Sequence, residues 1–352
     1  MSPGPEIVGQ IHGVAQSLEV QRKQHKLLGG FTRESILVSY FRNLTHYRQV
    51  KLLLIDGHYY VYRSFHAIQN LTNSKGEPAN AVYGFVKTVR KMIKDVRPDL
   101  AAVFWDEGMP QKRVALQPAY KQQREAMPDK MIPQLNFIQS FCGAMGLVSI
   151  SKPDTEADDL MGCYVMEARK TGVEVVLATN DKDLFQLVDP RVTVYSTNKT
   201  DLKNPKDSHA LLGEVEVTRK WDVPPHQIVE LLALTGDSVD NIPGIEGIGH
   251  KTAANLIREF GTVENLLQHL PDVKTEKLRL RLEQSEKQIR ENRQMVQLEL
   301  DHPLPVEISK LQIKPKYPEY IRGLEKYEFR TLLPEVQREA ENTFIGQGEL
   351  PL

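Results

Sequence analysis

Five short apolar runs alternate with helical stretches between residues 50 and 197, and this alternation limits the fold more than any other feature. Helical patterns separate the runs, at 81–96, 131–145 and 156–172. Strands that alternate with helices are typical of a parallel sheet with right-handed crossovers. The sequence therefore predicts an α/β fold, a parallel sheet flanked by helices, with strands at 50–56, 99–106, 146–150, 173–181 and 191–197.

After about residue 205 the pattern becomes mainly helical. Segments with helical periodicity or composition follow one another at 225–236, 250–261, 263–270 and 271–302, and the tail at 316–333 predicts one more short helical piece. We therefore divide the chain into an unassigned N-terminal extension, an α/β core, a helical domain and a C-terminal tail, at 1–48, 49–205, 206–302 and 303–352.

Composition limits the possible partners and compartments. The 352 residues carry a formal net charge of −1, so any basic surface for nucleic acid must be local. Two cysteines, Cys142 and Cys163, are too few for a disulfide framework or a zinc site, which favours the cytoplasm. No apolar run reaches the roughly 18 residues of a membrane span, and the N-terminus lacks the basic-then-apolar order of a signal peptide. We expect a cytoplasmic chain without a membrane partner.

Acidic residues stand where three of the predicted strands end. Asp56, Asp106 and Asp181 hold these positions, and in an open α/β sheet ligands bind at the carboxyl ends of the strands. The stretch EADD at 156–159 opens a helix with more acid than the helix dipole needs. With a later acid beside Asp181 and a pair in the helical domain, nine carboxylates become candidate metal ligands: Asp56, Asp106, Glu156, Asp158, Asp159, Asp181, Asp183, Asp237 and Asp240.

Taken singly, each of these acids is more typical of a helix cap or a turn. Brought together without counter-charge, they would repel one another and some would have to take up protons. Hard oxygen ligands without a nearby histidine or cysteine suit Mg²⁺ or Mn²⁺ better than zinc. Two such ions can activate a water molecule and stabilise the leaving oxygen when a phosphodiester is cleaved. The acids together therefore predict a two-metal phosphodiesterase.

The segment IPGIEGIGHKTA at 242–253 has the glycine spacing of a helix–hairpin–helix. Gly244, Gly247 and Gly249 allow a tight turn and a close approach of the backbone to a ligand. Hairpin N–H groups near the start of the next helix can bind a phosphate, and Lys251 can add a charge contact. The alternative is a glycine-rich loop that only connects two helices. On the functional interpretation the glycines bind duplex backbone while Asp237 and Asp240 reach the metals.

With these motifs, the chain resembles the 5′-nuclease family, which includes the 5′→3′ exonuclease domain of bacterial DNA polymerase I, phage 5′ exonucleases and flap endonucleases. The resemblance rests, in family order, on LLLIDGHYYVYRSFHA, VFWDEG, AYKQQR, EADD, TNDKDLFQLV and LTGDSVDNIPGIEGIGHKTA, and covers about 50–270. It implies a PIN-like core, a helical arch at about 107–130 and a helix–hairpin–helix (H3TH) domain. The first ion would lie nearer Asp56, Asp106, Glu156 and Asp158, and the second nearer Asp159, Asp181, Asp183, Asp237 and Asp240.

The same resemblance implies roles for further residues. Lys121 would contact the scissile phosphate and act in catalysis with Arg124, Asp56 and Asp181. DNA contacts would come from Arg63, Arg113, Tyr120, Lys121, Arg124, the three hairpin glycines, Lys251 and Thr252, and a K⁺ ion would bind at the hairpin. Tyr120 could stack on a base.

The resemblance also implies an activity and its partners. We expect a monomeric enzyme that acts as a structure-selective 5′→3′ exonuclease and 5′-flap endonuclease. Its substrates would be 5′-flap, nicked or 5′-ended duplex DNA, and its products would carry a 5′-phosphate. RNA primer removal and a separate DNA polymerase as partner fit this expectation. Two alternatives stay open: a metal-dependent ribonuclease on the same fold, and a non-catalytic DNA-binding protein.

Overall fold

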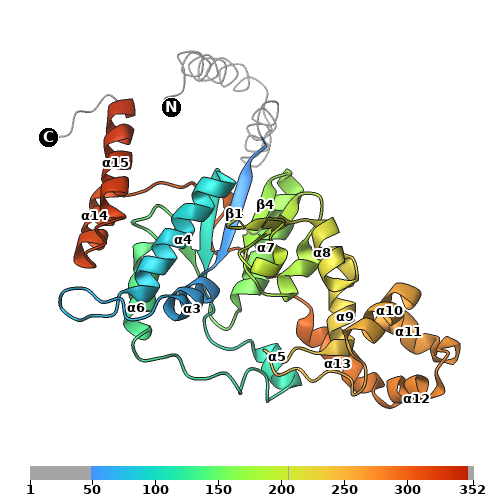
Figure 1. Ribbon diagram of the computed structural model, residues 1–352. Coiled ribbons are helices and arrows are strands. Elements are labelled where there is room, and N and C mark those ends of the chain that lie inside the picture. The colour runs from blue at the N-terminus through green and yellow to red at the C-terminus, as the bar shows by residue number, and fades with distance from the viewer. Residues whose placement is uncertain (1–48, 205, 348–352) are drawn as a thin grey trace, which may run out of the picture. The chain divides into compact units, whose positions relative to one another are not determined.

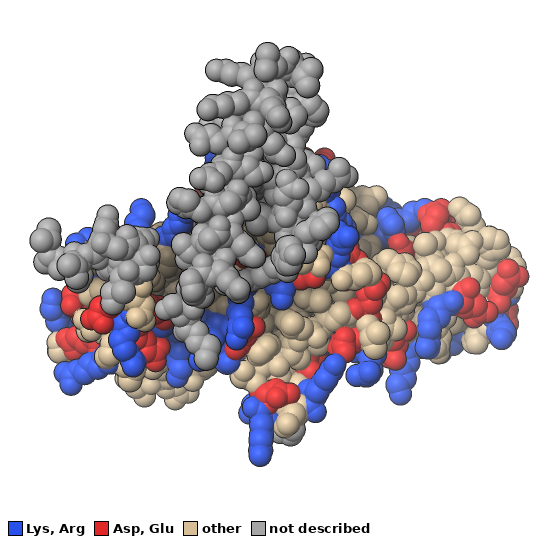
Figure 2. All heavy atoms as spheres, turned by 90° about the horizontal axis from the view of Figure 1, so that it is seen from above, with Lys and Arg blue, Asp and Glu red and all other residues tan. Residues whose placement is uncertain are grey.

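The computed structural model describes residues 49–204 and 206–347, so the extension predicted at 1–48 lies outside the described residues. Residues 50–332 form one compact unit, and the helix α15 (Leu333–Gln347) belongs to a separate one. No helix in the described ranges is long and apolar enough to cross a membrane. On the face drawn in Figure 2, Lys and Arg side chains are interspersed with Asp and Glu side chains. This mixture agrees with the net charge of −1, so any nucleic-acid site must depend on local basic groups.

A six-stranded sheet organises the compact unit, in the order β3-β2-β1-β4-β5-β6. Neighbouring strands from β3 to β5 pair in parallel, as predicted, but β6 pairs antiparallel with β5. The sheet is therefore mixed and not fully parallel. The three-residue strand β6 was not predicted. The strands are β1 (Lys51–Asp56), β2 (Leu100–Phe104), β3 (Val148–Ile150), β4 (Glu174–Ala178), β5 (Val192–Ser196) and β6 (Ala210–Leu212).

Helices lie on both faces of the sheet, with α3, α4 and α6 on one side and α7 and α8 on the other (Figure 1). The structure confirms the predicted helices as α4 (Asn80–Val96), α6 (Ile132–Phe141) and α7 (Ala157–Thr171). The helix α3 (Gly57–Ala67) was not predicted. Its sequence, GHYYVYRSFHA, is rich in aromatic and β-branched residues that are weak helix formers. It forms because Asp56 caps it, accepting a hydrogen bond from the Tyr59 N–H at 3.0 Å.

The central strand β1 is buried on both faces, which explains its continuous apolar sequence. Successive side chains of a strand point to opposite faces, so Leu52 and Leu54 face one side and Leu53 and Ile55 the other. All four are fully buried. Leu52 and Leu54 belong to a core that includes Tyr164 of α7 and continues into the helical region. Burial on both faces therefore fixes the position of β1, and Asp56 at its end lies at the edge of the sheet.

The helical region follows the sheet within the same compact unit. The structure confirms helices near each of the predicted segments, and adds α8 between β6 and α9. A single apolar core extends from the sheet into this region and includes Leu231 and Ile257 as well as Leu52 and Leu54 of β1. The helices are α8 (Glu214–Trp221), α9 (Ile228–Thr235), α10 (His250–Phe260), α11 (Val263–Gln268), α12 (Glu276–Gln284), α13 (Glu286–Val296) and α14 (Tyr317–Lys326).

The segment at 107–130 departs from the expected helical arch. Only α5 (Gln111–Leu116) is α-helical there, and the chain from 117 to 130 runs through turns toward α6. Lys121 has φ 56°, which is left-handed backbone and not helix. Lys121 and Arg124 therefore lie in turns and not on one face of an arch helix.

Candidate functional site

The carboxyl edge of the sheet brings the predicted acids together. Asp56 ends β1, and Asp106 and Asp181 follow β2 and β4 by a few residues. Burial, together with the charges of Asp106 and Asp181, raises the pKa of Asp56 to about 7. Asp181 in turn has its pKa raised by burial and by the charges of Asp240 and Asp237. These couplings connect the sheet edge to the acids of the helical domain.

Asp56 and Asp106 are oriented by hydrogen bonds from neighbouring elements. Thr179 Oγ1 donates to Asp56 Oδ2 at 3.1 Å, and the Ala157 N–H at the start of α7 donates to Asp106 Oδ1 at 2.9 Å. His58 Nδ1 lies 3.2 Å from Asp106 Oδ2. Burial alone would raise the pKa of Asp106, but the hydrogen bond and charge of His58 outweigh it and lower the pKa. Asp106 is therefore ionised without a metal, whereas Asp56 is partly protonated near neutral pH.

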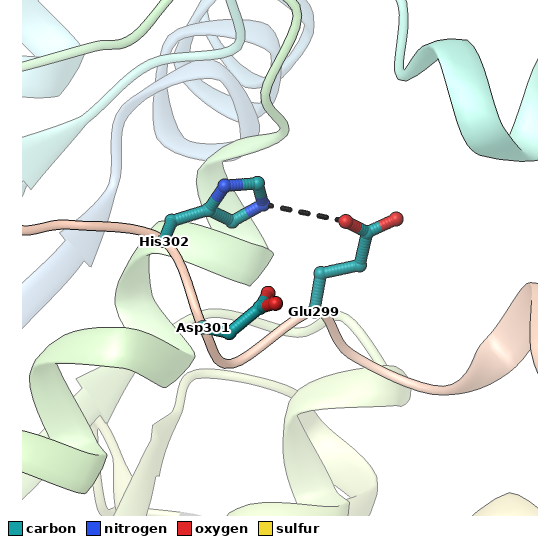
Figure 3. Close-up of side chains that lie close together, drawn as sticks. All are labelled: Glu299, Asp301 and His302. Carbon is teal, nitrogen blue, oxygen red and sulfur yellow. Dashed lines mark ion pairs between the residues drawn. The ribbon is translucent and has the colours of Figure 1, made fainter.

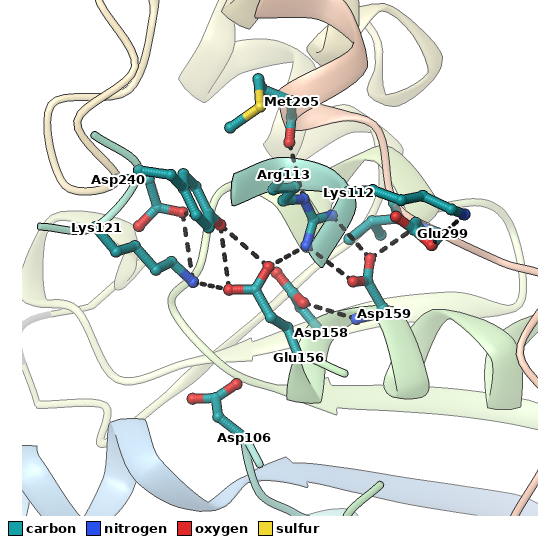
Figure 4. A network of polar contacts seen from close by, with 12 residues as sticks. Asp106, Lys112, Arg113, Lys121, Glu156, Asp158, Asp159, Asp240, Met295 and Glu299 are labelled. Carbon is teal, nitrogen blue, oxygen red and sulfur yellow. Dashed lines mark hydrogen bonds and ion pairs between the residues drawn. The ribbon is translucent and has the colours of Figure 1, made fainter. Parts of the chain in front are cut away.

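The first group of acids, Glu156, Asp158 and Asp159, opens α7 (Figure 4). Arg113 of α5 lies among them, and its side chain is 3 % exposed. Its guanidinium donates to Asp159 at 2.8 and 2.9 Å and to Glu156, and its Nε donates to Met295 O at 3.1 Å. Arg113 is thus an internal ion-pair partner and not the DNA contact that the resemblance implied.

The second group of acids, Asp183, Asp237 and Asp240, joins the turn after β4 to the loop after α9. Lys182 Nζ lies 2.7 Å from Asp237 Oδ1, an ion pair that the sequence analysis did not foresee. Asp183 Oδ1 is buried without a hydrogen-bond partner. Burial and the charges of its acidic neighbours raise the pKa of Asp183 well above its ordinary value. A buried carboxylate oxygen without a donor is the environment expected of a metal ligand.

The AYKQQR segment lies between the two groups. Tyr120 is 2 % exposed, and its hydroxyl lies 3.1 Å from both carboxylate oxygens of Glu156 and from Asp240 Oδ2, so it can donate to either acid. Lys121 Nζ donates to Glu156 and lies 3.7 Å from Asp240 Oδ2, while Arg124 Nη2 donates to Asp240 Oδ1 at 2.7 Å. Tyr120 therefore connects acids in the interior and is not exposed for stacking on a base, contrary to the prediction.

A third group of possible metal ligands, Glu299, Asp301 and His302, follows α13 (Figure 3). The sequence analysis did not select it. Lys112 Nζ lies 2.7 Å from Glu299 Oε2, and Lys152 Nζ lies 3.1 Å from His302 Nδ1. These lysines balance the charge of the third group. The first two groups, by contrast, contain a buried acid with a raised pKa and lie at the sheet edge.

The predicted hairpin precedes α10. A Cβ on Gly244 would lie 2.2 Å from Thr235 O, and Gly247 has φ +74°, so both positions require glycine. A Cβ on Gly249 would meet nothing within 4 Å. Gly249 is the N-cap of α10 and supplies no side-chain cap. The first N–H groups of α10 are thus left for an external acceptor, beside the exposed Lys251 and the half-buried Thr252.

Arg63, the remaining predicted DNA contact, is exposed on α3, away from the hairpin in the sequence. Its guanidinium donates to Tyr59 Oη at 3.2 Å and to Thr197 O at 3.5 Å. These are weak neutral contacts, and a phosphate oxygen could replace them.

The residues present fit divalent cations. The donors of both acidic groups are carboxylate oxygens, which Mg²⁺ and Mn²⁺ prefer. Five carboxyl groups of the nine have pKa values raised by burial and by one another: Asp56, Asp158, Asp159, Asp181 and Asp183. Bound cations would remove this repulsion and satisfy Asp183 Oδ1.

An α/β sheet with acids at its carboxyl edge, joined to a helical hairpin region, defines the class of PIN-like 5′ nucleases. Comparison with known proteins gives the family. Residues 51–222 match the profile of the 5′-3′ exonuclease N-terminal resolvase-like domain, and residues 223–319 match that of the 5′-3′ exonuclease C-terminal SAM fold. The chain belongs to the 5′-3′ exonuclease family, whose members are nucleases.

Relatives of different lengths match the chain. It is 37 % identical over 290 residues to DNA polymerase I of Rhizobium leguminosarum, covering 80 % of this chain but only 28 % of the polymerase. It is 35 % identical over 290 residues to a 5′-3′ exonuclease of Aquifex aeolicus, covering 82 % of this chain and 95 % of that protein. The fold is shared with a bacteriophage T5 flap endonuclease in a pseudo-enzyme–product complex with DNA and metal ions, at a TM-score of 0.59 and 21 % identity, covering 83 % of this chain and 99 % of that one.

Proposed function

We propose that this protein is a structure-selective 5′→3′ exonuclease and 5′-flap endonuclease that hydrolyses DNA phosphodiesters with two divalent cations and leaves 5′-phosphate products. One observation carries the proposal: two compact groups of acids stand near the carboxyl edge of the sheet, and Asp183 in the second group keeps a buried oxygen without a hydrogen-bond partner. Structural acids would be paired one by one with donors. An acid cluster that keeps such an oxygen is suited to cations.

The nine acids would together hold two ions, which we expect to be Mg²⁺ or Mn²⁺. The first ion would take ligands from Asp56, Asp106, Glu156 and Asp158, and the second from Asp159, Asp181, Asp183, Asp237 and Asp240. When bound, such ions supply activation of the attacking water and neutralisation of the leaving oxygen. The chain's part is to fix the carboxylates before substrate arrives, as the hydrogen bonds to Asp56 and Asp106 do.

Two cations of the chain are placed for the scissile phosphate. Lys121 and Arg124 both contact Asp240, so each stands at the border of the acid cluster. Lys121 is 11 % exposed, which leaves its ammonium desolvated and strengthens its field. We infer that a phosphate entering the site takes over part of the contact between these cations and the acids. A positive charge held there stabilises the charge that develops on the phosphate oxygens.

The hairpin would hold the duplex. Uncapped N–H groups at the start of α10, together with Lys251 and Thr252, form a site for a backbone phosphate. Arg63 would contact the 5′ strand. The known T5 complex with DNA and metal ions supports a DNA substrate. The match to DNA polymerase I supports a polymerase as partner, with RNA primer removal as a role. A K⁺ ion at the hairpin, a monomeric state and a cytoplasmic location stay predictions.

The test is a cleavage assay with 5′-flap, nicked and single-stranded DNA, in Mg²⁺ and in EDTA. We expect cleavage of the flap and the nicked duplex, 5′-phosphate ends on the products, and no cleavage in EDTA. Cleavage of RNA but not of DNA would favour the ribonuclease alternative. Mg²⁺-independent duplex binding without cleavage would favour a non-catalytic DNA-binding protein.

The hairpin is tested separately by Gly249→Val. The added side chain meets open space in the protein, so it would collide only with a ligand that approaches the backbone. We expect weaker binding of nicked duplex, by about tenfold, with a loss of stability no larger than the roughly 1 kcal/mol that a valine costs at an N-cap. Gly244→Val is the contrasting variant, because its Cβ would collide with Thr235 O and destabilise the fold. If Gly249→Val bound nicked duplex as tightly as the unchanged protein, the hairpin would not be the duplex site.

A further inference from the structure

The chain at 117–123 is fastened to the loop at 238–241 by contacts that the proposed chemistry does not use. Gln117 Nε2 donates to Asn241 O at 2.5 Å, and Asn241 Nδ2 donates to Ala119 O at 2.7 Å. Gln123 Nε2 donates to Ser238 O further along. We call this set of bonds the arch seam. It joins two segments that lie far apart in the sequence, because Gln117 and Asn241, which form the first bond, are 124 residues apart.

Both sides of the arch seam carry residues of the site. Lys121 belongs to the first segment and Arg124 directly follows it, and Asp240 belongs to the second. The Lys121 N–H donates to Asp240 O at 3.1 Å, so the seam continues through the backbone of the site itself. Lys121 has φ 56°, which L residues adopt rarely and retain only where their surroundings hold it. The bonds on either side of Lys121 provide that hold.

Asn241 meets two requirements at once. Its φ is 61°, a conformation that asparagine tolerates better than most residues, and its side-chain amide supplies the donor for Ala119 O. Gln117 returns a bond to the carbonyl of the same residue. The pair therefore closes a reciprocal contact next to Asp240. Neither side chain is recorded in contact with a carboxylate of the two acidic groups, so neither acts as a ligand.

We propose that Asn241 and Gln117 are positioning residues, which fix where Lys121 stands relative to Asp240 and to the scissile phosphate. This inference rests on the proposed nuclease function. Displacing a charged group by about 1 Å from its productive position can cost about a hundredfold in rate. The seam also means that the loop carrying Asp237 and Asp240 cannot move without moving the segment that carries Lys121. The two cations and the second group of acids thus take their places together.

The decisive variant is Asn241→Asp. Aspartate has nearly the same shape and also tolerates positive φ, but an ionised carboxylate cannot donate to Ala119 O. We expect the single-turnover cleavage rate to fall about tenfold or more, with affinity for nicked duplex changed less than twofold, because the hairpin carries binding. Asn70→Asp is the matched control: Asn70 is exposed with φ 58°, and its substitution should leave the rate unchanged. Asn241→Gly, which keeps the φ and adds no charge, should repeat the loss.

A double-mutant cycle with Lys121→Ala then identifies the route of the effect. If Asn241 acts through Lys121, Asn241→Asp should cause no further loss of rate in the Lys121→Ala protein. Trypsin should also cut after Lys121 and Arg124 faster in Asn241→Asp than in the unchanged protein, a readout that needs no activity. A normal single-turnover rate in Asn241→Asp, or fully additive losses in the cycle, would overturn the inference. If the unchanged protein cleaved no DNA but trypsin still cut Asn241→Asp faster, the proposed function would be wrong. The structural role of the arch seam would still be supported.

Discussion

The two groups of acids at the carboxyl edge differ in how their charge is balanced. The first group, Glu156, Asp158 and Asp159, lies within four consecutive residues and surrounds a buried arginine, Arg113. The second group, Asp183, Asp237 and Asp240, comes from two distant segments. Its partners are all more exposed than Arg113, at 22 % for Lys182, 11 % for Lys121 and 46 % for Arg124.

The two groups differ in how easily their partner cations can be displaced. Arg113 also donates to the backbone carbonyls of Met295 and Gln297, so it cannot leave without stranding several partners. Within the described residues, the side chains of Lys182, Lys121 and Arg124 contact carboxylates and donate to no backbone carbonyl. The first group is therefore braced by the fold, whereas the second group is held by cations that a metal or a phosphate can replace.

The largest effect should come from Asp181→Ala, at the edge of the second group. The change removes a proposed ion ligand and the acceptor of the Asp183 N–H, but no phosphate contact. We expect the cleavage rate to fall by about 10³-fold or more, equivalent to about 4 kcal/mol in the activation barrier. Binding of nicked duplex, measured by anisotropy, should remain within a few-fold. Near-normal turnover in a folded Asp181→Ala protein would refute the two-metal proposal.

A second, smaller effect should come from Arg113→Met in the first group. Methionine fills a similar volume but leaves Glu156 and Asp159 buried without their partner. Breaking a buried ion pair in this way typically costs about 3–5 kcal/mol, which urea denaturation of the metal-free protein would measure. Lys112→Met is the control. The Lys112 side chain is 71 % exposed, so its ion pair with Glu299 should contribute at most about 1 kcal/mol. Equal losses in the free energy of unfolding would mean that Arg113 stabilises the first group no more than an exposed lysine does.

The smallest effect is the pH dependence of the metal-free protein. Asp56 has a folded pKa of about 7, above its ordinary value of 3.8, so the folded state binds the proton more tightly than the unfolded state. Between about pH 4 and pH 7 the unfolded chain has lost this proton and the folded one keeps it, so stability falls as pH rises. Asp106, whose pKa is lowered, is ionised in both states throughout most of this window and does not offset the fall.

We therefore expect the melting temperature in EDTA to be lower at pH 8 than at pH 5.5, with Mg²⁺ removing most of the difference. Asp183→Asn sharpens the comparison, because it removes a buried charge from the second group. It should raise the melting temperature in EDTA at pH 8 by roughly 2–4 °C, about 1 kcal/mol. Asp159→Asn should lower it instead, because Arg113 loses part of its partner. A rise in both variants would show that the two groups do not differ.

The sequence by itself determined which residues have the chemistry. The acids stand at strand ends because a buried apolar run must stop where the chain turns, and this pattern is local. The glycines of the hairpin are equally local, since Gly247 needs its own positive φ. The positions of the first five strands and of the main helices along the chain follow from periodicity, which is why the α/β class and the helical region were predicted.

Only the tertiary structure decided how those residues are paired. The AYKQQR and EADD motifs contain no signal that Tyr120 points inward to Glu156 and Asp240, or that Arg113 braces the first group, because such contacts join segments distant in the sequence. The three-residue β6 exists because β5 offers an unpaired edge, and α3 forms because Asp56 caps it against its own weak propensity. Local sequence sets the backbone preference and the chemistry of each group. Which charge faces which depends on packing between distant segments, and that pairing separates the braced acids from the exchangeable ones.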